Sequence, residues 1–285
     1  MSEIILHTLE HAFFDTLKLF PFLLGTYLVL EYLEEKAGDK TLNLIQKSGR
    51  WGVPVGALCG LVPQCGLAAA ASNFYAARVI SVGTLAAVFL STSDEMLPIL
   101  ISNAVPMEQI VKILSLKAVA GLCWGFGLDL ICHRLLRIAP HTVDIETLCH
   151  NEKCQCEQGG ILKSALNHSL KISVFVFVIT WLFDILVKVV GVSALSAWIA
   201  YPVVGPMAAG LIGLIPNCSA SVVITQLYLE NAVTFGTMMS GVLVGAGVGL
   251  LVLYRVNPRM KENLLLTLYL YAAGVVSGCL IDCLF

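Results

Sequence analysis

Apolar residues form long runs over most of this chain, and short polar stretches separate the runs. The lengths of the runs predict ten helical segments, five in each half of the chain. In the first half they cover residues 10–34, 51–62, 66–77, 80–102 and 109–137, and in the second half 164–188, 204–215, 219–230, 233–255 and 261–284. This pattern is typical of an all-α polytopic membrane protein.

The two halves align with each other after a shift of 153 residues, without a gap. Residues 60–65, Gly-Leu-Val-Pro-Gln-Cys, align with 213–218, Gly-Leu-Ile-Pro-Asn-Cys. A polar element repeated within two apolar halves is typical of transporters built from internal repeats, with the substrate site where the repeats meet. We expect a first transmembrane repeat over 1–137, a linker over 138–163 and a second repeat over 164–285.

The second segment of each half is too short to cross a membrane. Residues 51–62 make a helix of about 18 Å, whereas the hydrocarbon core is ~30 Å thick. Pro63 and the Gln-Cys-Gly that follows it should end the helix there. The second and third segments therefore predict a re-entrant hairpin whose tip lies near the midplane. A bent single crossing is the alternative.

The positions of lysine and arginine favour the hairpins, which give each half three crossings and make the two repeats inverted. With the N-terminus outside, only Lys188 of the loop cations lies outside. The loop cations that then lie inside are Lys36, Lys40, Lys47, Arg50, Arg78, Arg134, Arg137, Lys153, Lys163, Arg255, Arg259 and Lys261. Single crossings split the same thirteen charges eight against five. We expect both termini outside and the linker in the cytoplasm.

Composition agrees with a membrane protein, because the chain is 58% hydrophobic and 13% charged, against about 25% charged in soluble domains. The lipid bilayer is the expected partner. A net charge of −2 predicts no nucleic-acid partner, and any oligomer is expected to be a homodimer.

The first segment is long and Lys18 is its first cation, which favours an anchor helix over a signal peptide. Seven of the ten cysteines lie in apolar segments, so we expect no disulfide framework.

The two tips, Pro63–Gly66 and Pro216–Ser219, predict a polar site inside the membrane. Non-helical backbone at membrane depth is tolerated only when it is buried in protein or lines a watery cavity. Both tips carry an amide and a thiol at matched positions. The candidate substrate-binding residues here are Gln64, Cys65, Asn217, Cys218, Ser219 and Gln226. A pair of proline kinks packed against small residues is the alternative.

A polar run at 91–95, Ser-Thr-Ser-Asp-Glu, interrupts the fourth segment, and glycine-rich 245–249 stands at the matching place. Both are poor helix interiors, so we expect both helices to unwind beside the tips. A carboxylate at this depth is costly and points to function. Ser91, Ser93, Asp94 and Glu95 therefore join the candidate substrate ligands. Either carboxylate could instead cap the half-helix that follows.

Oxygen ligands at this site suit a hard divalent cation such as Mn²⁺, whereas the two thiols suit a softer ion or trivalent arsenic. The predicted metal ligands are Gln64, Asp94, Glu95 and Asn217. Half-helices that point their N-termini at the midplane favour an anion, but the full charges of the two carboxylates outweigh this. No cofactor is expected besides the transported ion. The chain has no Walker-type loop, so we expect an ion gradient to drive transport.

The paired motifs resemble a known family. Gly-Leu-Val-Pro-Gln-Cys-Gly, Asn73-Phe74-Tyr75 and the 91–95 run, with Gly-Leu-Ile-Pro-Asn-Cys-Ser and 225–228, Thr-Gln-Leu-Tyr, are similar to the ten-helix heavy-metal exporter family. Its members are also labelled arsenic efflux proteins or manganese transporters. The resemblance covers nearly the whole chain and implies export across a prokaryotic plasma membrane. The organoarsenical efflux permeases are more distantly similar. Their tip has the pattern Pro-x-Cys-x-Cys-Gly, whereas here Gly66 follows Cys65 directly and the second cysteine is absent.

Equivalent charged residues occur in both repeats: Lys18 and Lys171 align, and so do Asp129 and Asp282. Their depths predict two ion pairs between repeats, Lys18–Asp282 and Lys171–Asp129. Snorkelling of both lysines to the headgroups is the alternative. The two aspartates, like the carboxylates of the 91–95 run, are candidates for proton handling. Asp184, which aligns with Glu31, is expected at the membrane interface because it lies near a helix end.

The linker carries a compact group of soft ligands, Cys149, His150, Cys154 and Cys156. Three thiolates and an imidazole could hold Zn²⁺ or Cu⁺. A solvated connector without metal is the alternative.

We thus expect a secondary-active exporter of a divalent metal, with Mn²⁺ first. Efflux of trivalent arsenic or another oxyanion is the second hypothesis, and an ion channel the third. An intramembrane enzyme would need Cys65 or Cys218 as its nucleophile, and no histidine lies in a predicted hairpin to serve as its base. We therefore expect no enzymatic activity.

Overall fold

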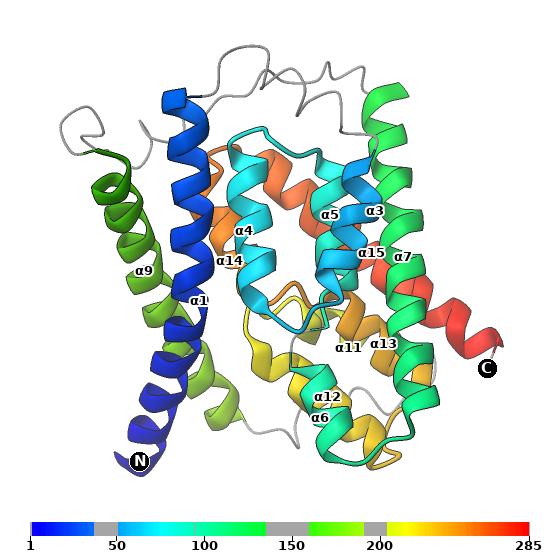
Figure 1. Ribbon diagram of the computed structural model, residues 1–285. Coiled ribbons are helices and arrows are strands. Elements are labelled where there is room, and N and C mark those ends of the chain that lie inside the picture. Colours follow the sequence, from blue (N-terminus) through cyan, green and yellow to red (C-terminus); the bar gives the residue numbers. More distant parts are fainter. Residues whose placement is uncertain (1, 37–50, 94, 135–159, 191–203, 285) are drawn as a thin grey trace.

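Every regular element is a helix in the part of the chain that the computed structural model describes, residues 2–36, 51–93, 95–134, 160–190 and 204–284 (Figure 1). The first half contains α1 (Ser2–Lys36), α3 (Gly52–Gly60), α4 (Cys65–Ala76), α5 (Val82–Ser91), α6 (Met96–Ser102) and α7 (Met107–Arg134). The second half contains α9 (Gly160–Val190), α11 (Gly205–Gly213), α12 (Cys218–Leu229), α13 (Phe235–Val244), α14 (Val248–Val256) and α15 (Met260–Leu284).

These helices confirm the ten predicted segments. Helices α5 and α6 together form the segment predicted over 80–102, and α13 and α14 form the one predicted over 233–255. Each of the other eight helices corresponds to one predicted segment. The local signals of proline, glycine and apolar run length therefore place the helices correctly.

Six stretches of the described chain are long and apolar enough to cross a membrane, three in each half. They are Thr8–Leu30, Val82–Ser102, Met107–Cys132, Leu162–Ile185, Phe235–Val256 and Met260–Leu284. The hairpin helices are shorter, with 9 residues in α3 and α11 and 12 in α4 and α12. Lengths of about 14 and 18 Å leave each of them well short of a ~30 Å hydrocarbon core.

The two repeats are inverted with respect to each other. Their opening helices, α1 and α9, pack side by side and run in opposite directions (Figure 1). Two contacts fix their register: His11 Nδ1 lies 3.2 Å from Asp184 Oδ2, and the rings of Tyr27 and His168 stack with centroids 4.9 Å apart. In Figure 1 the hairpin α3–α4 lies in the upper half of the view and α11 and α12 lie in the lower half.

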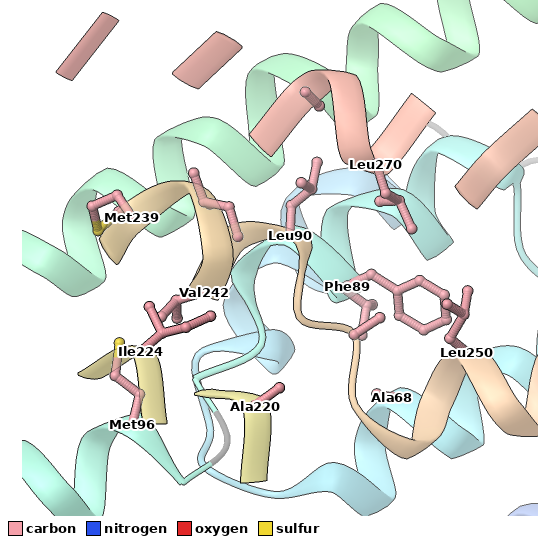
Figure 2. Close-up of a cluster of buried hydrophobic side chains, with 14 of the residues drawn as sticks. Ala68, Phe89, Leu90, Met96, Ala220, Ile224, Met239, Val242, Leu250 and Leu270 are labelled. Atoms are coloured by element: carbon pink, nitrogen blue, oxygen red, sulfur yellow. The ribbon is translucent and has the colours of Figure 1, made fainter. Parts of the chain in front are cut away.

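The interrupted helices form the centre of the protein, and the long unbroken helices surround them. Most residues of Val82–Ser102 and Phe235–Val256 are buried, whereas most residues of the other four spans are not. Figure 2 shows the central cluster, in which Phe89 of α5, Val242 of α13 and Ile224 of α12 pack together with Met96 of α6. Both repeats thus contribute to one apolar core, and the exposed apolar side chains of the outer helices suit contact with lipid.

Equivalent aspartates fasten the start of each interrupted helix. Asp129 accepts hydrogen bonds from the Gly83 amide and the Ser81 hydroxyl, each 2.8 Å long. Asp282 accepts from the Gly236 amide at 2.7 Å and from the Thr234 hydroxyl at 2.8 Å. These carboxylates satisfy amides that a helix N-terminus leaves without partners and favour its positive dipole end. The pairs belong to single repeats: α7 caps α5, and α15 caps α13.

This capping bears on the two ion pairs predicted between the repeats. The prediction of a Lys18–Asp282 pair is wrong, because Lys18 Nζ lies 3.6 Å from Asp15 Oδ1 on its own helix, while both oxygens of Asp282 cap α13. The oxygens of Asp129 serve α5 in the same way, and the Lys171–Asp129 pair stays a prediction. Similar depth was the only basis for predicting the Lys18–Asp282 pair, and the partner that Asp282 has is the nearby start of α13.

Candidate transport site

The two hairpin tips have the same backbone geometry. Gln64 and Asn217 are extended, with φ near −149° and −146°, and each is the residue before the next helix begins. In each tip the amide of this residue donates a 2.7 Å hydrogen bond to the carbonyl two residues earlier, that of Val62 or Ile215. In both tips the helix therefore ends three residues before the proline and a new helix begins at the cysteine.

Both interrupted helices unwind beside the tips, as the sequence predicts. In the first repeat the Ser93 amide and hydroxyl donate to the carbonyls of Gly60 and Leu61 at 3.2 and 2.6 Å, which ties the unwound segment to the end of α3. In the second repeat the break passes through Gly247, whose φ of 52° and ψ of −139° suit glycine. Close packing replaces side-chain bonds there, because a Cβ on Gly213 would clash with the Gly241 carbonyl.

The serines of the first break serve the backbone. The Ser91 hydroxyl donates to the carbonyl of Ala87 one turn earlier, and Ser93 donates to the α3 end. Both side chains are fully buried. Glu95 is half-buried at the start of α6, and Asp94 lies outside the described residues. The structure thus shows a structural role for both predicted serine ligands and leaves the substrate role of the 91–95 run a prediction.

Asp184 is the main residue that sequence reasoning missed. We expected it at the interface, but it is buried against the second tip. Its Oδ1 accepts hydrogen bonds from Asn217 Nδ2 at 2.6 Å and from the Ser219 hydroxyl at 3.0 Å. Its Oδ2 lies 3.2 Å from His11 Nδ1. One carboxylate therefore joins α9 and the α11–α12 tip of the second repeat to α1 of the first.

A short series of charged side chains along α1 leads to this carboxylate. His11 Nδ1 also lies 3.3 Å from Asp15 Oδ2, and Asp15 contacts Lys18. The side chains are 65% exposed at Lys18, 15% at Asp15, 47% at His11 and 6% at Asp184, so the series ends at its most buried member. His11 gave no sequence signal, because it lies in an opening helix with no recognisable motif. The network exists only because α1 and α9 pair in this register.

The first tip is built differently at the corresponding places. Gly66 stands where the second tip has Ser219, and a Cβ on Gly66 would clash with the Phe22 ring of α1. Gln64 is half-buried, whereas Asn217 is buried. The site is therefore symmetric in its backbone and asymmetric in its side chains: polar contacts hold the second tip, and an aromatic ring covers the first.

The two cysteines of the tips pack against one apolar cluster. This cluster also contains Leu23 of α1, Ala69 of α4 and Val248 of α14. The thiols of Cys65 and Cys218 thus belong to the same region of the protein, in apolar surroundings where a thiol behaves as a small apolar side chain. Among the predicted site residues, Gln226 lies apart: it is exposed on α12, about 12 Å along the helix from Cys218.

No group of three or more His, Cys, Asp or Glu side chains in the described part of the chain is arranged to hold a metal ion. The linker residues Cys149, His150, Cys154 and Cys156 lie outside that part, so the linker metal site stays a prediction. The predicted metal ligands Gln64, Glu95 and Asn217 also stay predictions. What the second tip does bring together is one carboxylate, one side-chain amide and one hydroxyl, with the amide nitrogen and the hydroxyl donating to the carboxylate.

Comparison with known families gives one result for both repeats. A family model described as "Putative, 10TM heavy-metal exporter" matches residues 1–148 and again residues 131–281. Each matched segment contains all or most of one predicted repeat. Searches of curated proteins and of solved structures gave no match. Together the two matches span nearly the whole chain, and the protein belongs to this ten-helix family of heavy-metal exporters.

Proposed function

We propose that the protein is a secondary-active exporter of a divalent metal ion, Mn²⁺ in particular, with its ion site between the inverted repeats. The observation that carries this proposal is the contact of buried Asp184 with Asn217 and Ser219 of the broken tip and with His11 of the other repeat. Transporters of this architecture bind substrate at the repeat interface, beside broken helices. A buried carboxylate within a membrane span is costly and is functional by default.

The chemistry of the ligands favours a hard ion. The Asp184 carboxylate, the Asn217 side-chain oxygen and the Ser219 hydroxyl are oxygen ligands, which suit Mn²⁺. Asp94 and Glu95 of the first break are proposed as further ligands. A metal ion that binds Asp184 competes with His11 for Oδ2, so binding at the tip loosens the contact between the repeats.

Efflux of trivalent arsenic is the second candidate. It is favoured by one observation, that Cys65 and Cys218 pack against the same apolar cluster. Thiolates are the ligands such a metalloid needs. The polar contacts, however, gather at Asp184 and not at either thiol, which favours the divalent metal.

The proposed setting is the plasma membrane of a prokaryote, with both termini outside and the linker in the cytoplasm. In support, Arg78 and Arg259, which we placed on the same side, both bind Glu262, at 2.9 and 3.0 Å.

The orientation can be tested by cysteine-accessibility labelling of intact cells. Single cysteines are placed in the linker and at the C-terminus, and a membrane-impermeant reagent is added. The proposal expects only the C-terminal cysteine to react.

A growth screen tests the proposed function. The full chain is expressed in an efflux-deficient bacterium and challenged with Mn²⁺, Zn²⁺, Cd²⁺ and arsenite. We expect protection against Mn²⁺ that Asp184→Asn abolishes and that Cys65→Ser and Gln226→Ala retain, Gln226 being the exposed control on α12. Protection against arsenite that depends on Cys65 would favour the second candidate, and no protection against any of the four would contradict both.

A further inference from the structure

An ion pair joins the two repeats on the side that the proposed orientation places in the cytoplasm. Arg78, which follows α4 of the first repeat, donates a 2.9 Å hydrogen bond to Glu262 Oε2, at the start of α15 in the second repeat. The hydroxyl of Tyr75 donates to the same oxygen at 3.1 Å, and Arg259 donates to Oε1 at 3.0 Å. The Arg78 side chain is only 9% exposed, so this pair is screened less than an ion pair on the surface.

The backbone at Arg78 indicates that this side chain has a use. Its φ is 61°, a left-handed conformation that costs an arginine more than it costs an asparagine. The equivalent position of the second repeat is Asn231, with a φ of 58°, so the chain makes the same turn there with a residue that suits it. An arginine held in such a conformation points to a function, and the contact with Glu262 supplies one.

The equivalent residues at the opposite face of the protein are uncharged. Because the repeats are inverted, residues that align in sequence lie at opposite faces. Asn231 takes the place of Arg78 there, and Gln109 takes the place of Glu262. Both Asn231 and Gln109 are exposed. The two faces therefore differ: an ion pair between the repeats fastens one, and neutral, exposed side chains stand at the same positions of the other.

The packing behind these residues differs in the same sense. Ser72 of α4 donates a 2.7 Å hydrogen bond to the Gly249 carbonyl of α14, and a Cβ on Gly249 would clash with Ala68 of α4. Seven of the nine residues of α14 are buried. At the equivalent place Thr225 of α12 donates to the Ser221 carbonyl of its own helix, and only two of the seven residues of α6 are buried. In Figure 1 the close pair, α4 and α14, lies in the upper half of the view, and α6 and α12 lie in the lower half.

We propose that Arg78 and Glu262 form a latch that holds the exporter closed on the cytoplasmic side and opens each time an ion enters. This inference rests on the proposed exporter function. Helices α4 and α14 run from the first tip and the second break towards this side, and the latch fastens them. In transporters built from inverted repeats, one repeat moves against the other around the site. Opening of α4 and α14 is therefore coupled to closure of α12 and α6 at the outer side. Because the outer positions carry no ion pair, the state closed to the cytoplasm is the resting state.

Hydrogen–deuterium exchange of the purified full chain, followed by mass spectrometry, tests the latch. In the wild type we expect slower exchange in α4 and α14 than in α12 and α6. Glu262→Gln keeps the shape of the side chain and removes its charge, and Arg78→Asn installs the residue of the other repeat, which suits the backbone. We expect either variant to accelerate exchange in α4 and α14 by about tenfold, the factor that a hydrogen bond to a charged group supplies, and to slow exchange in α12 and α6.

The opposite changes on the two sides distinguish a latch from a contact that only stabilises its own surroundings, which would alter α4 and α14 alone. Gln109→Ala, at the position equivalent to Glu262, is the control and should leave all four helices unchanged. Equal exchange on the two sides of the wild type, or variants whose changes are absent or confined to α4 and α14, would overturn the inference. The exchange measurement needs no transport, so it decides on the latch even where the growth screen contradicts the exporter function.

Discussion

Trp124 donates a 2.8 Å hydrogen bond from its indole Nε1 to the hydroxyl of Ser277, and these two residues occupy equivalent positions in the two repeats. Residues related by a two-fold axis contact each other only close to that axis. The pseudo-two-fold axis of the repeats therefore passes between α7 and α15 at this contact. Tyr269 strengthens the contact, since its hydroxyl donates to the Trp124 carbonyl at 2.7 Å and its ring meets the indole edge to face.

The contact on the axis predicts an energetic coupling between the repeats. Trp124→Phe and Ser277→Ala each remove one partner of the same hydrogen bond. In a double-mutant cycle we expect a coupling of about 0.6 kcal/mol, the average for side-chain hydrogen bonds between membrane helices. Unfolding of the purified variants in denaturant measures it, and strictly additive effects would argue against a direct contact.

The aspartate caps predict a loss of stability that does not involve lysine. Asp129→Ala and Asp282→Ala each remove two hydrogen bonds at a helix start, and we expect each to cost about 1–2 kcal/mol. Lys18→Ala should cost little and should combine additively with Asp282→Ala. If Asp282→Ala instead recovered stability lost in Lys18→Ala, that result would support the Lys18–Asp282 ion pair predicted from the sequence.

The asymmetry of the tips predicts different effects at equivalent positions. Gly66→Ala brings a Cβ against the Phe22 ring, and overpacking of this kind costs about 1–3 kcal/mol. Phe22→Leu should relieve part of that cost. Ser219→Ala, at the equivalent place, removes only hydroxyl contacts with Asp184 and Asn217. Thermal unfolding compares the variants, and equal effects of the two alanines would show that the tips are alike.

The linker predicts a second, independent metal site. Cys149, Cys154 and Cys156 offer thiolates and His150 an imidazole, the ligands that Zn²⁺ prefers. We expect the purified full chain to retain Zn²⁺ after desalting, as measured by elemental analysis, and a variant with the three cysteines changed to serine to lose it. Equal zinc content in both proteins would dispose of the linker site.

Local signals explain why the helices and breaks could be predicted. Pro63 and Pro216 each follow the end of a helix, and the run at 91–95 and the glycines at 245–249 weaken helix formation. The tips and unwound segments therefore follow from residues within a few positions of one another. Because the two halves align after a shift of 153 residues, each prediction made for one half also applies to the equivalent residues of the other.

The polar contacts of the site could not be predicted in this way. Asp184 and His11 are 173 positions apart, and they meet because of the register in which α1 and α9 pair. The repeat shows which residues are equivalent but not which ones touch. The Arg78–Glu262 pair gave no signal either, because the equivalent residues, Asn231 and Gln109, carry no charge.

Binding of Mn²⁺ to the purified full chain, followed by electron paramagnetic resonance, tests most directly whether the ion site lies between the repeats at the second tip. Asp184→Asn keeps the shape of the side chain and removes its charge, and Gln226→Ala on the exposed side of α12 is the control. We predict that the wild type and Gln226→Ala bind Mn²⁺ and that Asp184→Asn loses most of the affinity. Unchanged binding by Asp184→Asn would contradict a metal site at this tip.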